Sequence, residues 1–196
     1  MRTKTLLVVA ALAFSLCLAP ATFAQNLITN GSFETGDFSG WTTGGNFEDT
    51  QVVSGAYYDY SGAQDGTFYA TLGPVGSDGT LSQTLTTVSG SQYTISFWFA
   101  SVGDNPSDFS VLWDGTPLLS LTNPNTGSNW TQYTFTATGT GSDTLSFAFR
   151  DDPAYMALDD VSILCCGPTV PEPSSLLLLG TGVLGLGGLG RRKLGR

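Results

Sequence analysis

The stretch Tyr93-Thr94-Ile95-Ser96-Phe97-Trp98-Phe99 decides the fold class of this 196-residue chain. Its apolar side chains fall at every second position, so they share one face of a β-strand. The same alternation recurs at Phe109, Val111 and Trp113, at Tyr133, Phe135 and Ala137, and at Leu145, Phe147 and Phe149. Gly-, Pro- and Asn-rich turns separate these runs, and outside the two chain ends no window of eleven residues shows helical periodicity. The pattern predicts an all-β protein, a β-sandwich of eight or more short antiparallel strands.

Composition excludes several function classes. The chain contains 25 Gly and no His, which removes Ser-His-Asp catalysis and any zinc site that needs imidazole. Between Glu34 and Asp160 there are fifteen acidic residues and a single basic one, Arg150, so the domain repels phosphate backbones and we expect no nucleic-acid partner. Asp151-Asp152 and Asp159-Asp160 do not form glycosidase acid pairs, because adjacent strand residues point to opposite faces. We therefore expect a protein that is not an enzyme.

Residues 1–24 have the pattern of a secretion signal. Arg2 and Lys4 precede an apolar run over residues 6–18, and the small-residue exit at 21–24 predicts cleavage before Gln25. The alternative is a transmembrane anchor, but the apolar run is short and Pro20 interrupts it.

The C-terminus carries a second tag. A linker over residues 165–173 contains Cys165, Cys166 and the motif Pro171-Glu172-Pro173. Residues 174–190 are uncharged and, as a helix, would span about 25 Å, which predicts a single transmembrane helix. Arg191 and Arg192 open a basic tail, residues 191–196, that we expect to stay cytoplasmic.

This C-terminal arrangement resembles the PEP-CTERM sorting signal of Gram-negative bacteria. The resemblance implies an inner-membrane intermediate, processing by an exosortase, and delivery to the cell surface, outer envelope or medium. It also implies an organism that makes exopolysaccharide and biofilm. A plain tail anchor, the alternative, gives no reason for the Pro-Glu-Pro motif. The thiols of Cys165 and Cys166 fit intermolecular disulfides, attachment chemistry near the processing site, or a linker without a fixed role.

The two ends of the predicted domain, residues 26–164, carry a further resemblance. The domain opens with Asn26-Leu27-Ile28-Thr29-Asn30-Gly31-Ser32-Phe33-Glu34 and then Phe38-Ser39-Gly40-Trp41, and it closes with residues 157–163, Ala-Leu-Asp-Asp-Val-Ser-Ile. These motifs resemble the galactose-binding-like jelly roll found in carbohydrate-binding modules. The resemblance implies a jelly-roll fold and a core position for Trp41.

The acidic residues near these ends predict a structural calcium ion. Strand alternation places Asp159 on one face with Ala157, Val161 and Ile163, which we expect to be buried and therefore to need a counter-charge. Calcium takes carboxylate and carbonyl ligands without His. The resemblance implies that Glu34 and Asp159 hold it, with Asp160 as the alternative partner. Otherwise Glu34 simply faces solvent beside a turn.

Exposed aromatic side chains are the candidates for binding sugar rings. Trp98 lies opposite the predicted core face, in phase with Gln92, Thr94 and Ser96. Trp130, Tyr69 and the segment 57–60, which contains Tyr58 and Tyr60, are further candidates. The alternative for each of these residues is ordinary packing.

Two function hypotheses remain. In the first, an exported cell-envelope or matrix protein binds extracellular polysaccharide through a non-catalytic domain. In the second, the protein is purely structural or adhesive and has no specific glycan ligand.

Overall fold

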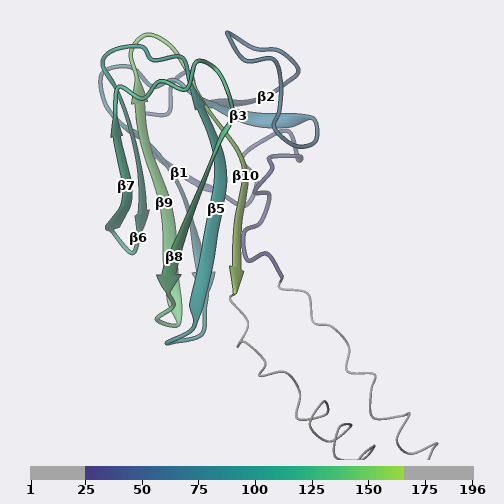
Figure 1. The fold of residues 1–196 in the computed structure, drawn as a ribbon, viewed down its shortest axis with the longest axis vertical. Coiled ribbons are helices and arrows are strands. Elements are labelled where there is room, and N and C mark those ends of the chain that lie inside the picture. The colour runs from purple at the N-terminus through teal and green to yellow at the C-terminus, as the bar shows by residue number, and fades with distance from the viewer. Residues whose placement is uncertain (1–24, 166–196) are drawn as a thin grey trace, which may run out of the picture. The chain divides into compact units, whose positions relative to one another are not determined.

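The computed structural model describes residues 25–165, which form two five-stranded antiparallel sheets (Figure 1). Sheet I has the order β1 (Thr42–Gly45), β4 (Gly79–Thr86), β9 (Ser142–Asp151), β6 (Ser107–Trp113) and β7 (Thr116–Thr122). Sheet II has the order β2 (Gln51–Ser54), β3 (Phe68–Leu72), β10 (Met156–Cys165), β5 (Gln92–Ser101) and β8 (Thr131–Thr138). Between residues 25 and 165 the structure holds no membrane-spanning helix.

The core lies between the sheets and follows the period-two pattern. On β5, Tyr93, Ile95, Phe97 and Phe99 are buried, and they face the inward residues of β6 and β9. The rings of Phe97 and Phe147 meet edge to face at 5.4 Å, so the two sheets contact through aromatic side chains. This confirms the predicted faces of the central strands and the predicted β-sandwich.

Turn chemistry connects β6 to β7. The two residues between them, Asp114 and Gly115, both have positive φ, 49° and 75°. This is the backbone that a two-residue hairpin needs to match the twist of its strands. The connection between β6 and β7 is thus the tight turn of a β-hairpin.

The opening segment lies against the closing strand. Leu27 N–H donates to the Ile163 carbonyl at 2.9 Å, and Val161 N–H donates to the Gly31 carbonyl at 2.9 Å. A Cβ on Gly31 would lie 2.0 Å from the Val161 carbonyl oxygen, so only glycine allows this approach. Trp41 is buried beside this segment, as the resemblance implies, and its indole donates to the Asn30 carbonyl at 3.0 Å. The two end motifs therefore form one structural unit, although more than a hundred residues separate them.

Strand β10 ends at Cys165, one residue beyond the predicted domain boundary, and this side chain packs against the core. The predicted signal peptide at 1–24 lies outside the described residues. So do the sorting motif, the transmembrane helix and the basic tail.

Candidate functional site

One half of the outer surface of sheet II is polar and partly exposed, and Trp98 is its aromatic residue. Cross-strand register places Gln132 of β8 beside Trp98, and Ser96 lies between Thr134 of β8 and Ser162 of β10. We call Ser96, Trp98, Gln132, Thr134 and Ser162 the Trp98 face. Trp98 is partly buried, Gln132 and Thr134 are exposed, and the Ser96 and Ser162 hydroxyls share a hydrogen bond of 2.8 Å.

The Asp160 carboxyl lies beside the Trp98 side chain. Burial and the nearby charge of Asp65 raise the pKa of the Asp160 carboxyl, whereas a hydrogen bond with the Trp98 side chain lowers it. An indole N–H donates only, so the Asp160 carboxylate is the acceptor. A partly exposed aromatic ring bordered by an amide, a carboxylate and hydroxyls has the composition of a sugar-binding surface.

The other half of this surface is covered, which corrects two of the predicted exposed aromatics. Tyr60 and Tyr69 are buried, at 2% and 0% exposure, in a second small core with Ala100 and Ala157. Tyr60 belongs to the loop before β3. Its hydroxyl donates to the Tyr155 carbonyl, which holds the ring in this small core. Because their faces are packed, neither Tyr60 nor Tyr69 can stack on a ligand in this conformation.

Trp130 belongs to the same small core. Its ring centroid lies 5.8 Å from that of Tyr69, and its indole N–H donates to the Gly62 carbonyl at 3.2 Å. It is partly buried. Trp130 thus holds the covering loop beside the Trp98 face. Its ring is packed against neighbouring aromatic rings, whereas we expected it to be exposed.

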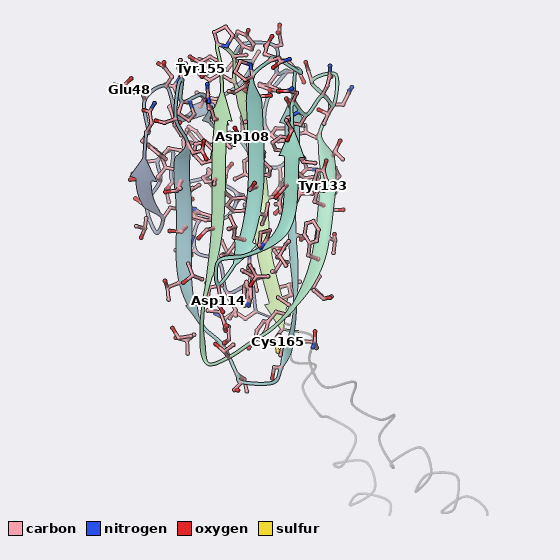
Figure 2. All side chains as sticks on the ribbon, turned by 90° about the vertical axis from the view of Figure 1, so that its left-hand side faces the viewer. Glu48, Asp108, Asp114, Tyr133, Tyr155 and Cys165 are labelled. Atoms are coloured by element: carbon pink, nitrogen blue, oxygen red, sulfur yellow. The ribbon has the colours of Figure 1, made fainter. Side chains whose placement is uncertain are left out.

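Tyr58 remains exposed, at 53%, but it lies elsewhere. Its ring meets the edge of Tyr155, with centroids 5.4 Å apart, and Tyr57 makes a similar contact with Tyr155. Figure 2 shows Tyr155 at one end of the sandwich, opposite the end that carries Asp114 and Cys165. The structure therefore divides the predicted aromatic candidates into the Trp98 face, a packed cluster and a separate tyrosine patch.

Glu34 and Asp159 converge on one loop, residues 64–68. Glu34 Oε1 accepts the backbone N–H groups of Thr67 and Phe68, both at 2.8 Å. Asp159 Oδ2 accepts those of Gln64 at 2.8 Å and Asp65 at 3.2 Å. The opening and closing motifs therefore hold this loop between two carboxylates.

A β-bulge changes the predicted face of Asp159. The register shifts by one residue between Asp159, opposite Trp98, and Ser162, opposite Ser96, and Asp160 has a φ of 47°. Because of the extra residue, Asp159 shares the outer face with Ala157, whereas Val161 and Ile163 point into the main core. The side chain is fully buried as predicted, but it is covered by the 64–68 loop.

The side chains that could bind a metal ion at this loop are acidic. Burial raises the pKa of Asp159 to about 6, although three backbone N–H groups oppose the shift. Arg150, the single basic residue between positions 25 and 165, pairs instead with Asp152. In this part of the chain no cluster of three His, Cys, Asp or Glu side chains could hold a metal ion. Two carboxylates fit calcium only when carbonyl oxygens or water complete the coordination.

Residues 25–154 match the family model described as a carbohydrate-binding domain. The chain belongs to the carbohydrate-binding domain family. Residues 169–193 of this family member match the PEP-CTERM protein-sorting motif, which marks a secreted, membrane-processed protein that reaches the cell surface. No curated protein sequence matches the chain.

Solved structures of similar fold establish the jelly roll of this carbohydrate-binding domain. A family 61 module solved with β-1,4-galactotriose matches with a TM-score of 0.60 at 18% identity, covering 72% of this chain and 99% of that chain. The CBM22-1 xylan-binding domain of Paenibacillus barcinonensis Xyn10C matches with a TM-score of 0.52 at 20% identity, covering 74% and 97%. The C-terminal family 22 module of Clostridium thermocellum Xyn10B matches with a TM-score of 0.52 at 15% identity, covering 78% and 100%. At these identities the similarity shows the fold and no ligand.

Proposed function

We propose that this protein is an exported, non-catalytic module that binds extracellular polysaccharide through the Trp98 face. Membership of the carbohydrate-binding domain family supports a glycan ligand. The observation that carries the location is the partly exposed Trp98 ring, bordered by Gln132 and Asp160 on an otherwise hydroxyl-rich surface.

The binding step follows from the chemistry of this surface. The apolar face of a pyranose ring stacks on the Trp98 indole, and the hydroxyls at the ring edge hydrogen-bond to neighbouring polar groups. Gln132 supplies an amide that both donates and accepts, and Asp160 supplies a carboxylate acceptor.

Calcium is proposed as a structural ion at the 64–68 loop. Glu34 and Asp159 supply carboxylates, and Asp160 and Asp65 add negative charge nearby. A bound cation would neutralise these charges and fix the loop that borders the Trp98 face. Its role is positional, because the ion would hold the loop and not the sugar.

Sorting completes the proposal. An exosortase-type enzyme processes the chain at Pro171-Glu172-Pro173 after an inner-membrane intermediate, and the domain is delivered to the outer envelope or the exopolysaccharide matrix. Intact-mass measurement of the mature protein should show loss of the C-terminal residues 174–196. Glu172→Ala should retain them in the membrane fraction, and identical masses for both proteins would contradict this step.

The binding proposal is tested with residues 25–165, which enclose their own core. We expect retention on one class in a panel of immobilised polysaccharides, including the host's own. Trp98→Ala should lower the affinity by about 30-fold or more, the range of a ligand-binding hot spot. Val88→Ala, a truncation of an exposed apolar residue on the β4–β5 turn, is the matched control and should change nothing.

The pattern of variants separates the hypotheses. Loss of retention in Tyr58→Ala with full retention in Trp98→Ala would move the site to the tyrosine patch. Retention on no glycan by a folded protein would leave the structural or adhesive alternative.

A further inference from the structure

Asp151 is a fully buried carboxylate whose partner is missing. It ends β9 on the core-facing side, with 0% exposure. Within residues 25–165, neither of its side-chain oxygens has a hydrogen-bond partner. Buried carboxylates are ordinarily hydrogen-bonded or paired with a cation, so this one requires an explanation.

Asp143, at the other end of the same strand face, shows how this protein satisfies a buried carboxylate. It is also 0% exposed, but it accepts bonds from the Thr140 N–H at 2.9 Å, the Thr140 hydroxyl at 2.8 Å and the Thr87 hydroxyl. Burial acts to raise the pKa of Asp143, yet these bonds outweigh it and lower the pKa to about 2. The environment of Asp151 supplies no such donors.

The charges around Asp151 are negative. Burial, and then the carboxylates of Asp104 and Asp152, raise the pKa of Asp151 to about 7. Asp104 lies in the connection from β5 to β6, three residues before Ser107, the cross-strand neighbour of Asp151. Arg150 bonds to Asp152, so the one basic residue of this part of the chain is already paired. No basic side chain of residues 25–165 is therefore free to pair with ionised Asp151, so the carboxyl either keeps its proton or takes a cation from solution.

We propose that Asp151 and Asp104 form a second cation site, for calcium, at the end of the sandwich that carries Tyr155. Their carboxylates supply the charged ligands, and backbone carbonyls of the loops closing this end, together with water, complete the shell. Calcium accepts such a mixed and irregular oxygen shell of six to eight ligands, whereas magnesium demands near-ideal octahedral geometry. Zinc does not fit, because the site contains neither His nor Cys.

This site is separate from the loop held by Glu34 and Asp159. Those carboxylates contact residues 64–68, and Asp159 lies on the outer side of sheet II. Asp151 lies on the inner side of sheet I. A cation at one position shares no carboxylate ligand with the other, so the two can be tested independently.

The test is calcium titration by calorimetry of the full-length chain in detergent, after removal of metal with EDTA. We expect a binding event that Asp151→Asn abolishes and Asp104→Asn weakens at least tenfold, with a dissociation constant of about 10⁻⁴–10⁻³ M for an extracellular site with few charged ligands. Asp143→Asn is the matched control: it alters a buried aspartate of the same strand face and should leave calcium binding intact.

Thermal unfolding gives a second readout. If Asp151 only packed in the core, its replacement would not change how much calcium raises the melting temperature. In EDTA, Asp151→Asn should melt at or above the wild-type temperature, because an unpaired buried charge is removed. In saturating calcium the wild type should gain several degrees, and the variant should gain less. A control change that only disturbs packing lowers the melting temperature equally in both conditions.

The outcomes distinguish the two calcium sites. If Glu34→Gln removes all calcium binding and Asp151→Asn removes none, the Asp151 site is overturned and the loop site stands. If Asp151→Asn removes all binding, the loop site is wrong and this one stands. Equal calcium stoichiometry and equal melting gain in the wild type and Asp151→Asn would also overturn the proposal.

Discussion

Without calcium, the stability of the domain should fall as the pH rises from about 4 to 7, and Asp151 should account for much of the change. Its pKa is raised from 3.8 to about 7 by burial and by the charges of Asp104 and Asp152. The folded form therefore holds a proton that the unfolded chain has already released in this window. Stability is thus highest below the unfolded pKa and is lost up to the folded pKa.

The magnitude follows from the size of the shift. A difference of about three pKa units corresponds to about 4 kcal/mol, lost between pH 4 and pH 7 and constant above it. Asp159, with a pKa raised to about 6, adds a change of the same sign over a narrower window. Tyr58 and Tyr60 also feel the Asp151 charge, but burial raises the pKa of both hydroxyls, so they stay protonated here.

Urea denaturation in EDTA between pH 4 and pH 8, followed by tryptophan fluorescence, measures this effect. Asp151→Asn should remove most of the pH dependence and leave the smaller part due to Asp159. Asp143→Asn is the control, because the lowered pKa of Asp143 affects stability only as the pH falls below about 4. Parallel pH profiles for the wild type and Asp151→Asn would refute the reasoning that the buried carboxylate is unpaired.

Two further predictions concern packing and the 64–68 loop. Phe97→Ala should lower the free energy of unfolding by about 3–5 kcal/mol in urea, because the ring is fully buried between the sheets; a loss below about 1 kcal/mol would contradict that packing. Gly66→Ala should destabilise more than Gly76→Ala in thermal unfolding. Both have positive φ, but a Cβ on Gly66 would lie 2.4 Å from Glu34 Oε1, whereas a Cβ on Gly76 meets nothing within 4 Å. Equal losses would show that the loop moves away from Glu34 without cost.

The sequence predicted the core because each central strand packs on one face only. Alternation in residues 93–99 therefore identified the buried side chains correctly, and the turn residues located the hairpins. The same rule failed at Asp159 because Asp160 adds a bulge residue, and an Asp-Asp pair gives no periodic sign of one. Aspartate tolerates positive φ better than most residues, which is the local property that permits the bulge.

Contacts between distant segments explain the other differences. The burial of Tyr60 and Tyr69 depends on a loop that folds over the outer side of sheet II, and local pattern cannot show which part of an outer face is covered. The positions of Gln132 beside Trp98 and of Ser162 beside Ser96 depend on strand register. That the Asp151 carboxylate has no hydrogen-bond partner in the described part of the chain depends on all the loops that close this end of the sandwich, so local sequence could not predict it. That Asp151 and Asp152 point to opposite faces was predictable, because they are adjacent at the end of a strand.

The place of β10 in sheet II determines how the domain responds to mechanical load. This strand is the last of the described chain and lies in the middle of its sheet, hydrogen-bonded to β3 on one side and to β5 on the other. A pull on the chain beyond Cys165 acts along the strand axis, so the hydrogen bonds of both ladders resist it together in shear. An edge strand pulled across its axis would instead open one bond at a time. Under the proposed function, a load applied between the bound glycan and the chain beyond Cys165 would therefore act on both ladders of β10.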